Sequence, residues 1–460
     1  MLIAGVVGML SFLTNALSIT TQRFLSFHQG ANQLEKQKQI FSTSLIIHVI
    51  LGVAVLIILE IIGLFLFDGW LLIPSDRISA AKYIFHFVVL MVLAMLIAAP
   101  FRAALIAHEN LIYISVIDIV DGVLKVVVAF IITNATLDKL ILYAILMASI
   151  YIFALICLAT YDFIKYKECV FPSLKYNDRT TVRQLGSFAA WSLYSSGCIV
   201  ARNQGTAITI NHFFGTIINA SYGIAIQVFG AISFISSSIL TAFTPQIVKS
   251  AGKGDLNRML ALSRTASKLS FALMIMVATP LCFRITDLLS IWLDEIPPET
   301  PTLCIIVIIT TVCDQITSGL ISVNRAIGKL RRYSLIVDST KLLTIPLLIL
   351  SLSIDIPLRY AISCFAACEL AGALLRLPVI NKNVTVNISF WISDVLVKSA
   401  VPIAILTALY YFERYLDFNF TRFIASIIIF SSVYLLLYYF ISCNANEKGQ
   451  LKKLLTRKRQ

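Results

Sequence analysis

Apolar stretches of about 20 residues recur along the whole chain and restrict the fold more than any other feature of the sequence. An α-helix needs about 20 residues to cross a hydrocarbon core of roughly 30 Å. With 58% hydrophobic and only 13% charged residues, a water-soluble chain could not bury so much apolar surface. The sequence therefore predicts an all-α polytopic membrane protein with about 13 transmembrane helices. The thirteen stretches are 1–20, 45–67, 83–107, 111–133, 141–163, 188–212, 218–242, 269–291, 302–324, 334–353, 359–380, 390–412 and 422–443.

Lysine and arginine residues are distributed unequally between the loops on the two sides of the predicted membrane. One side holds five of them in 165–183, five in 249–268 and six in 448–459. The other side holds Arg77, Lys139, Arg359 and Arg414. Because positive residues collect on the cytoplasmic side, we expect a cytoplasmic C-terminus and an external start at Met1. This placement accounts for the net charge of +13 without a nucleic-acid partner.

The chain contains an internal repeat at an offset of 222 residues. Residues 8–34 read GMLSFLTNALSITTQRFLSFHQGANQL, and residues 230–256 read GAISFISSSILTAFTPQIVKSAGKGDL. In each copy an apolar, Ser/Thr-rich helix leads into a basic loop. Copies that lie six helices apart have the same orientation, so we expect two parallel-repeat six-helix lobes. The matched residues are Gly8, Ser11, Phe12, Gly30 and Leu34 with Gly230, Ser233, Phe234, Gly252 and Leu256.

The repeat predicts where the domains begin and end. A helix at 188–212 precedes the repeated helix in the second half, and its counterpart would lie before Met1. We therefore expect the first helix of the N-terminal lobe to be missing; a thirteen-span protein is the alternative. The expected domains are an N-terminal transmembrane lobe at 1–163, a cytoplasmic linker at 164–186, a C-terminal transmembrane lobe at 187–383, an extra transmembrane helix pair at 384–443 and a basic cytoplasmic tail at 444–460.

Several ionisable residues lie inside predicted spans, where a lipid-exposed charge costs about 2.5–3.5 kcal/mol on insertion scales. Most must therefore face the protein interior, water or an interface. Arg102 near the cytoplasmic interface, and Arg284 and Asp287 near the external one, fit side chains that snorkel toward water. Three pairs are spaced to neutralise each other on one helix face: Asp121 with Lys125, Asp338 with Lys341, and Asp394 with Lys398.

Arg202 differs because no acidic residue within one helical turn can pair with it. An unpaired guanidinium suits a cavity for an anionic, hydroxyl-rich ligand, because its planar fork of donors fits phosphate. An interhelical salt bridge to Asp118 or Asp314 is the alternative. The neighbouring Asn203 and Gln204 could hydrogen-bond sugar hydroxyls or only bridge helices. The polar and aromatic stripe around Arg202 comprises Trp191, Tyr194, Ser195, Cys198, Thr206 and Thr209.

The motifs of several enzyme classes are missing. The sequence contains no GxxxxGK[ST] phosphate-binding loop, no HExxH and no GxSxG. The nine cysteines lie mostly in apolar spans without a CxxC pair, and Cys364 and Cys368 fit helix packing better than a metal site. We therefore expect a transporter without a metal or cofactor rather than an enzyme.

The segment NHFFGTIINASYGIAIQVFGAISFISSSILTAFTPQIVKSAGKGD at 211–255 resembles the oligosaccharidyl-lipid flippases of the polysaccharide transport family. This family is part of the multidrug/oligosaccharidyl-lipid/polysaccharide exporter superfamily. TQRFLSFHQG at 21–30 resembles the family's first cytoplasmic loop, and the likeness extends over roughly residues 1–383. The positions that carry it are Asn211, Phe214, Gly215, Asn219, Ala220, Gly223, Ala225, Gln227, Pro245 and Gly252.

The resemblance implies two six-helix lobes around a cationic cavity, followed by an extra helix pair. It implies alternating access that moves an undecaprenyl-diphosphate-linked oligosaccharide across the bacterial inner membrane for O-antigen, capsule or exopolysaccharide biosynthesis. The expected partners are this lipid-linked oligosaccharide, membrane lipids and glycan polymerase or ligase machinery. The missing first helix is a departure from the family's pattern.

The sequence also fits two other functions. A cation-coupled multidrug exporter of the same superfamily is one alternative to a lipid-linked oligosaccharide flippase, and it would prefer acidic residues in the cavity. A non-transporting membrane protein of glycan assembly, or an enzyme that polymerises glycans, is another. The expected substrate-binding residues are Arg202, Asn203, Gln204, Tyr194, Arg102, Lys125 and Arg376, and the expected ion-coupling residues are Asp118, Asp121 and Asp314.

Overall fold

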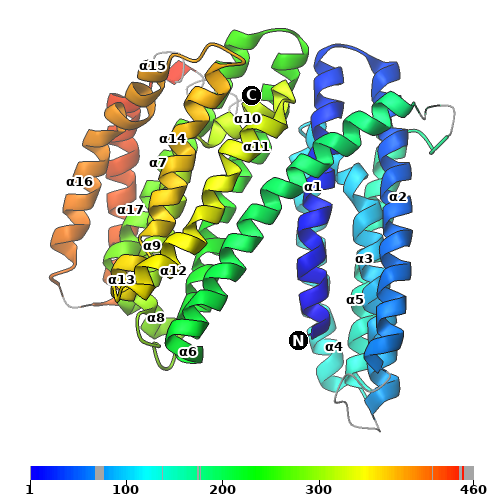
Figure 1. The fold of residues 1–460 in the computed structure, drawn as a ribbon, viewed down its shortest axis with the longest axis horizontal. Helices are drawn as coiled ribbons and strands as arrows, with labels where there is room; N and C mark the ends of the chain where they lie inside the picture. Colours follow the sequence, from blue (N-terminus) through cyan, green and yellow to red (C-terminus); the bar gives the residue numbers. More distant parts are fainter. Residues whose placement is uncertain are drawn as a thin grey trace. The chain divides into compact units, whose positions relative to one another are not determined.

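The computed structural model describes residues 2–67, 77–136, 138–173, 176, 178–416, 418–444 and 448–449, with side chains from residue 13 onward (Figure 1). Within these ranges the regular structure is helical and contains no strand. The prediction of an all-α protein is confirmed.

The chain divides into two compact units. The first consists of Met1–Gly197 with Val248–Asp255, and the second of Cys198–Ile247 with Leu256–Gln460. In the first unit, α3 packs against α1, α2 and α5. Its helices are α1 (Leu2–Gly30), α2 (Leu34–Phe65), α3 (Ile78–Ala107), α4 (Leu111–Asn134), α5 (Lys139–Lys165) and both ends of α6 (Arg179–Gly252).

The second unit is built around α9, which packs against α7 and α14, while α10 contacts all three of these helices. It also contains the middle of α6. Its other elements are α7 (Leu256–Phe283), α8 (Ile285–Trp292), α9 (Thr300–Gln315), α10 (Ser318–Ile327), α11 (Leu330–Ile336), η4 (Asp338–Leu343), α12 (Thr344–Ser353), α13 (Leu358–Ala361), α14 (Cys364–Asn381), α15 (Ile388–Ile392), η5 (Ser393–Val397), α16 (Lys398–Glu413), α17 (Phe420–Leu437) and η6 (Tyr438–Ser442).

The 74-residue helix α6 contains two of the predicted spans. They are separated at Gly215, whose φ of 79° and ψ of −170° are not helical. A residue with a side chain rarely adopts a φ in this range, so a glycine is required at the break. The break lies in the segment Asn211–Gly215, which carries part of the family resemblance.

Nine of the described helices are long and apolar enough to cross a membrane, and α9 with α10 forms a tenth if this pair, bent by 49°, counts as one span. Each of the thirteen predicted stretches lies on a helix or on a broken helix. Large apolar side chains stay exposed on these helices; Ile112 of α4 is 81% exposed and Phe130 is 68% exposed. Such a surface needs lipid around it. The chain is therefore a multi-pass membrane protein.

The two copies of the repeat end in the same local structure. α1 ends at Gly30 and α6 at Gly252, and the residues two positions later, Asn32 and Gly254, have φ of 56° and 78°. This is the Schellman arrangement of a helix C-terminus. The bonds Gln33 N–H to His28 O (2.9 Å) and Asn32 N–H to Gln29 O (3.2 Å) match Asp255 N–H to Ser250 O (2.9 Å) and Gly254 N–H to Ala251 O (3.0 Å).

These two helix ends also contact each other reciprocally within the first unit. A Cβ atom on Gly30 would lie 2.2 Å from the carbonyl oxygen of Lys249, and one on Gly252 would lie 2.0 Å from that of Phe27. Residues 27 and 249 are themselves related by the offset of 222. Each copy of the repeat thus uses the same two positions to pack against the other copy. This symmetry supports the repeat that the sequence predicts.

α16 and α17 form the C-terminal helix pair and pack on α7 (Figure 1). The Tyr434 hydroxyl donates to the carbonyl of Ala272 at 3.2 Å. Arg284, expected to snorkel, is 6% exposed and instead donates to Glu413 Oε2 at 2.9 Å and, at 3.2 Å, to Asp287. The snorkelling prediction for Arg284 is wrong because the end of α16 supplies a carboxylate.

Candidate functional site

The second unit contains a cavity of about 220 Å³ between α6, α9, η4 and α14. Ionic and hydroxyl side chains line much of it, with Ile199, Phe229 and Leu240 as the apolar part. The ionic and hydroxyl residues of the wall are Arg202, Ser233, Ser236, Ser237, Thr310, Thr311, Asp314, Lys341 and Glu369.

Glu369 of α14 joins three elements around this cavity. Its Oε2 accepts from Arg202 Nη1 of α6 at 2.5 Å, and its Oε1 accepts from Lys341 Nζ of η4 at 2.5 Å. The Arg202 guanidinium also lies 4.2 Å from the ring centroid of Phe365. Glu369 and Arg202 are 3% and 2% exposed, so both ion pairs are shielded from solvent.

A second ion pair lies beside the first. Arg376 of α14 is 2% exposed and binds Asp314 of α9 through Nη2, and its Nη1 donates to the Asp314 carbonyl at 3.1 Å. Arg376 Nη2 is also 3.8 Å from Glu369 Oε1. The Asp314 side chain is 27% exposed, which makes it the most accessible charge of the cluster.

The five charged side chains, here called the ionic cluster, do not neutralise one another. Arg202, Lys341 and Arg376 are three cations, and Asp314 and Glu369 are two carboxylates. Each arginine has a carboxylate partner, and Lys341 is the additional cation that shares Glu369. Buried charges are stable only when paired and hydrogen-bonded. The excess positive charge next to a cavity therefore favours an anionic group as a ligand.

The hydroxyl groups of the wall add hydrogen-bond acceptors. Thr310 and Thr311 donate their protons to helix carbonyls at 2.7 Å and 2.9 Å, and Ser236 donates to Gln315 Oε1. Their oxygens are left with lone pairs. These oxygens can accept hydrogen bonds from the hydroxyl groups of a ligand.

The interpretation of Arg202 as an unpaired guanidinium is wrong. The alternative, an interhelical salt bridge, is correct in kind, but the partner is Glu369 rather than Asp118 or Asp314. Lys341, which the spacing pairs with Asp338, binds Glu369. In both cases the carboxylate comes from α14, a helix far from Arg202 and Lys341 in the sequence.

The other predicted site residues are divided between the units. Asn203 lies next to Arg202 and accepts from its Nε at 3.4 Å, whereas Gln204 is exposed and does not line the cavity. Tyr194 belongs to the first unit and packs against Trp191. The structure therefore brings together Arg202, Asn203, Arg376 and Asp314, but not the rest.

Four predicted residues form ion pairs in the first unit. Arg102 of α3 holds Asp118 of α4 with two hydrogen bonds of 2.9 Å and 2.7 Å. Lys125 binds Asp121 at 2.6 Å on α4, which confirms the spacing argument for that pair. In the second unit, Lys398 binds Asp394 at 2.7 Å, which confirms another pair predicted from its spacing.

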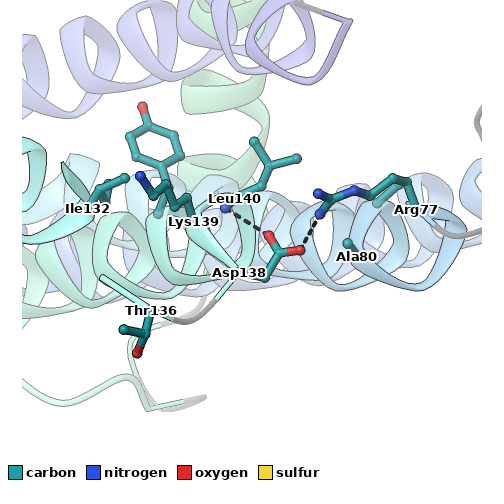
Figure 2. A pocket seen from close by; sticks show the side chains of 9 residues that line it. Arg77, Ala80, Ile132, Thr136, Asp138, Lys139 and Leu140 are labelled. Atoms are coloured by element: carbon teal, nitrogen blue, oxygen red, sulfur yellow. Dashed lines mark hydrogen bonds and ion pairs between the residues drawn. The ribbon is translucent and has the colours of Figure 1, made fainter. Parts of the chain in front are cut away.

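A further cavity of about 990 Å³ lies in the first unit where α3 begins and α5 begins (Figure 2). Asp138 caps α5 by accepting from the N–H groups of Leu140 and Ile141. Figure 2 shows its contacts with Leu140 and with Arg77. These backbone hydrogen bonds, and then Arg77, hold the pKa of Asp138 below its usual value. The acid of this cavity is thus already committed to a helix cap and an ion pair, which indicates a structural role.

Sequence reasoning missed Glu369 and Lys341 as members of the site. A signal for Glu369 was present, because Arg376 follows it by seven residues and therefore lies on the same helix face. For Lys341 the nearby Asp338 concealed the long-range partner. Among the residues with described positions, no group of three His, Cys, Asp or Glu side chains is arranged to hold a metal ion.

Comparisons with known proteins show the fold. No protein-family model matches the sequence, and no curated protein sequence matches it. A MOP superfamily transporter from Pyrococcus furiosus is 14% identical with a TM-score of 0.71, over 81% of this chain and 86% of that chain. The Vibrio cholerae MATE transporter VcmN in its bent form is 15% identical with a TM-score of 0.69, over 82% and 86%.

A eukaryotic MATE transporter, AtDTX14, is 12% identical with a TM-score of 0.66, over 82% of this chain and 86% of that chain. The Pyrococcus protein is described as having a binding pocket of reverse polarity, which suggests a different function for that transporter. At these identities the likeness concerns the fold alone. The chain has the fold of MATE transporters.

Proposed function

We propose that the chain is an exporter of the MOP superfamily, the multidrug/oligosaccharidyl-lipid/polysaccharide exporters, and that its substrate carries an anionic group. The fold of MATE transporters supports an exporter that works by alternating access. The observation that carries the substrate class is the ionic cluster, in which three cations face two carboxylates. An anion next to this cluster would balance its charge.

An oligosaccharide linked to undecaprenyl diphosphate combines the two features that the cavity favours. Its diphosphate is anionic, and its sugars carry many hydroxyl groups that can donate to Thr310, Thr311 and Ser236. A cavity of about 220 Å³ takes only part of such a molecule, so the second unit would hold the diphosphate or one sugar. On this proposal the protein acts in the bacterial inner membrane, with its C-terminus in the cytoplasm, alongside glycan polymerase or ligase machinery.

A cation-coupled multidrug exporter is the second candidate, and two observations favour it. The similar solved structures include proteins named MATE transporters. The most accessible charge of the ionic cluster is the carboxylate of Asp314, which suits a cationic ligand. The two candidates differ in whether the excess cation Lys341 or the more accessible Asp314 contacts the substrate.

Ion coupling through Asp118, Asp121 and Asp314 is a prediction that the ion pairs make more specific. Each carboxylate is bound by a basic side chain. A coupling proton or sodium ion would have to displace Arg102, Lys125 or Arg376 from its partner. Export coupled to an ion gradient would therefore break one of these pairs in every cycle.

A deletion strain complemented with two lysine variants tests the substrate class. Lys341→Gln leaves both arginine–carboxylate pairs in place and neutralises the ionic cluster. Lys329→Gln is the matched control, because it also removes one positive charge and Lys329 is exposed at the start of α11. We expect Lys341→Gln, and not Lys329→Gln, to accumulate lipid-linked oligosaccharide and to lose surface glycan. Unchanged glycan pools with altered sensitivity to cationic drugs would favour the multidrug exporter instead.

A further inference from the structure

Three basic side chains of the second unit surround one buried carboxylate, where α7 packs against η5 and α16. Asp394 of η5 is 0% exposed. Its Oδ1 lies 2.7 Å from Lys398 Nζ and 3.5 Å from Lys268 Nζ. Its Oδ2 lies 3.1 Å from Arg264 Nε. These four side chains, here called the C-terminal basic cluster, share no residue with the ionic cluster.

Two π-helical turns position the C-terminal basic cluster. Asp394 lies in η5 and Ser442 in η6, and both segments are π-helical. Lys268 Nζ donates to the Ser442 carbonyl at 2.6 Å, and Ser442 Oγ donates to the Lys398 carbonyl at 2.7 Å. π-Helical turns are rare and occur frequently at functional sites. The cluster is therefore assembled by specific backbone contacts, with Lys268, 3% exposed, on its inner side.

Lys398 and Arg264 are the accessible cations of the cluster, with side chains that are 34% and 25% exposed. An ammonium group has three donors and a guanidinium has five. Lys398 Nζ uses two of its donors, for Asp394 Oδ1 at 2.7 Å and for Asn444 Oδ1 at 2.8 Å. Arg264 faces Asp394 through Nε, and its guanidinium lies 4.2 Å from the ring centroid of Phe390. Its two terminal amino groups have no carboxylate partner among the described residues.

The charge of this cluster favours an anion as a ligand. Within the described ranges, three cations share the single carboxylate of Asp394. Partly buried charges are stabilised by a counter-charge that accepts their hydrogen bonds. A phosphate group suits this place, because its oxygens accept from the planar fork of an arginine and from a lysine together.

Exposed apolar side chains flank the two accessible cations. Phe390, next to Arg264, is 43% exposed, and Val397 and Val401, on either side of Lys398 along the chain, are 62% and 51% exposed. Acyl chains would cover this surface, whereas a soluble anion would leave it bare. The distribution of charge predicts that this end of α7 is cytoplasmic. Basic pockets between membrane helices on that side bind anionic lipid headgroups.

We propose that the C-terminal basic cluster binds the phosphate of an anionic phospholipid from the cytoplasmic leaflet. Arg264 and Lys398 contact the phosphate, while Lys268 holds Asp394 and η6 in place and adds positive charge. The lipid thereby ties the first turns of α7 to the C-terminal helix pair. The inference goes beyond the proposed function and does not depend on which substrate is exported.

Native mass spectrometry of the delipidated full chain, titrated with phosphatidylglycerol or phosphatidylcholine of identical acyl chains, tests the proposal. We expect the first phosphatidylglycerol to bind at least tenfold more tightly than the first phosphatidylcholine. Arg264→Gln and Lys398→Gln should each weaken phosphatidylglycerol binding roughly tenfold, the effect of one charge-assisted hydrogen bond. Both should leave phosphatidylcholine binding unchanged. Equal affinities of the wild type for the two lipids would overturn the proposal.

Matched controls separate the cluster from the general attraction of a basic surface for anionic lipids. Arg331→Gln and Lys382→Gln remove the same charges from exposed positions of the second unit and should not change the affinity. A loss in these controls as large as in the cluster variants would contradict a specific site. If Arg264→Gln does not fold, Lys398→Gln still decides between the two outcomes.

Excess glycerol 3-phosphate tests whether the ligand is a lipid or a soluble phosphate. It carries the same phosphate without acyl chains, so we expect it to leave phosphatidylglycerol bound. Displacement of the lipid by glycerol 3-phosphate would assign the cluster to a soluble phosphate compound and overturn the lipid site.

Discussion

Glu369 is the residue on which the ionic cluster depends. It binds Arg202 and Lys341 directly and lies 3.8 Å from Arg376. Removal of one partner from a buried ion pair lowers the free energy of unfolding by far more than the intact pair raises it, because the remaining charge is left uncompensated. The cluster therefore fixes α6, η4 and α14 in one arrangement.

Glu369→Gln is expected to lower the free energy of unfolding by about 3–5 kcal/mol, because it leaves the buried guanidinium of Arg202 and the ammonium of Lys341 without a counter-charge. Thermal unfolding of the purified protein measures this change. Glu295→Gln, in an exposed loop, removes the same charge and should have little effect. Equal unfolding temperatures for the two variants would show that Glu369 does not hold the cluster together.

Asp162 of α5 presents the opposite situation. Its side chain is 0% exposed, and neither carboxyl oxygen has a hydrogen-bond partner in the part of the chain that is described. Asp162→Leu is expected to raise the free energy of unfolding by about 1–3 kcal/mol, the penalty of a buried polar group without a partner. Thermal unfolding beside the exposed control Asp294→Leu measures it. A large loss of stability in Asp162→Leu would mean that the carboxyl group has a partner after all.

Sequence spacing predicts ion pairs at this scale only when both partners lie on one helix. Asp121 with Lys125 and Asp394 with Lys398 are confirmed for that reason. Arg202 and Lys341 bind Glu369, which is 167 and 28 residues away. Such pairs depend on how helices pack, and a single sequence does not contain that information.

Helix ends carry the clearest structure at the scale of elements. Gly30 of α1 and Gly252 of α6 let the two helix backbones approach closely. A Cβ atom on either glycine would overlap the backbone of the other helix. Lys249 Nζ binds Glu109 Oε1 at 2.6 Å beside this crossing. The repeated glycines therefore mark a close helix crossing as well as a helix end.

Gly252→Ala is expected to lower the free energy of unfolding by about 1–3 kcal/mol, because the added methyl group overlaps the Phe27 carbonyl and forces the helices apart. Gly30→Ala should act in the same way against Lys249. Gly223→Ala is the control, since a Cβ there has nothing within 4 Å, and it should be neutral or stabilising by about 0.5–1 kcal/mol. Chemical denaturation compares the three. Equal effects of Gly252→Ala and Gly223→Ala would exclude a close crossing.

The pair of His108 and Glu168 predicts a pH dependence. Burial alone would raise the pKa of the Glu168 carboxyl, but the hydrogen bond and charge of His108 outweigh it and lower the pKa below 4.5. A carboxyl group whose pKa is lower in the folded state stabilises the fold at pH values above its pKa in the unfolded state. This stabilisation is lost as the pH falls through the pKa in the folded state. Stability should therefore decline below about pH 4.5 and decline less in Glu168→Gln. Unfolding temperatures measured across this range test it, and identical acid limbs would contradict it.

Element positions follow from the sequence because lipid imposes a length on each apolar stretch. All thirteen expected spans lie on helices, including the two that α6 joins. The breaks within them were not predicted, such as those of α9 from α10 and of α7 from α8. The first of these breaks falls at Gln315–Ser318 and the second at Arg284, so each lies at polar or charged residues inside a stretch that is apolar as a whole.

The distribution of charge predicts the topology of the whole molecule. Six basic residues in 448–459 predict a C-terminus in the cytoplasm. A fluorescent protein fused after Gln460 should fold and fluoresce, while a phosphatase that is active only outside the cytoplasm should stay inactive there. The reverse pattern would invert the topology and place the basic loops outside.

The ionic cluster is proposed to select an anionic substrate. Binding of a polyprenyl diphosphate and of a lipophilic cation to the full chain in nanodiscs tests it most directly, with wild type and Lys341→Gln compared. We expect the diphosphate to bind to the wild type. Lys341→Gln should weaken this binding roughly tenfold or more by loss of a charge-assisted hydrogen bond, and Lys329→Gln should not. Preferential binding of the cation, unchanged or strengthened in Lys341→Gln, would exclude an anion-selective cluster and support a multidrug exporter.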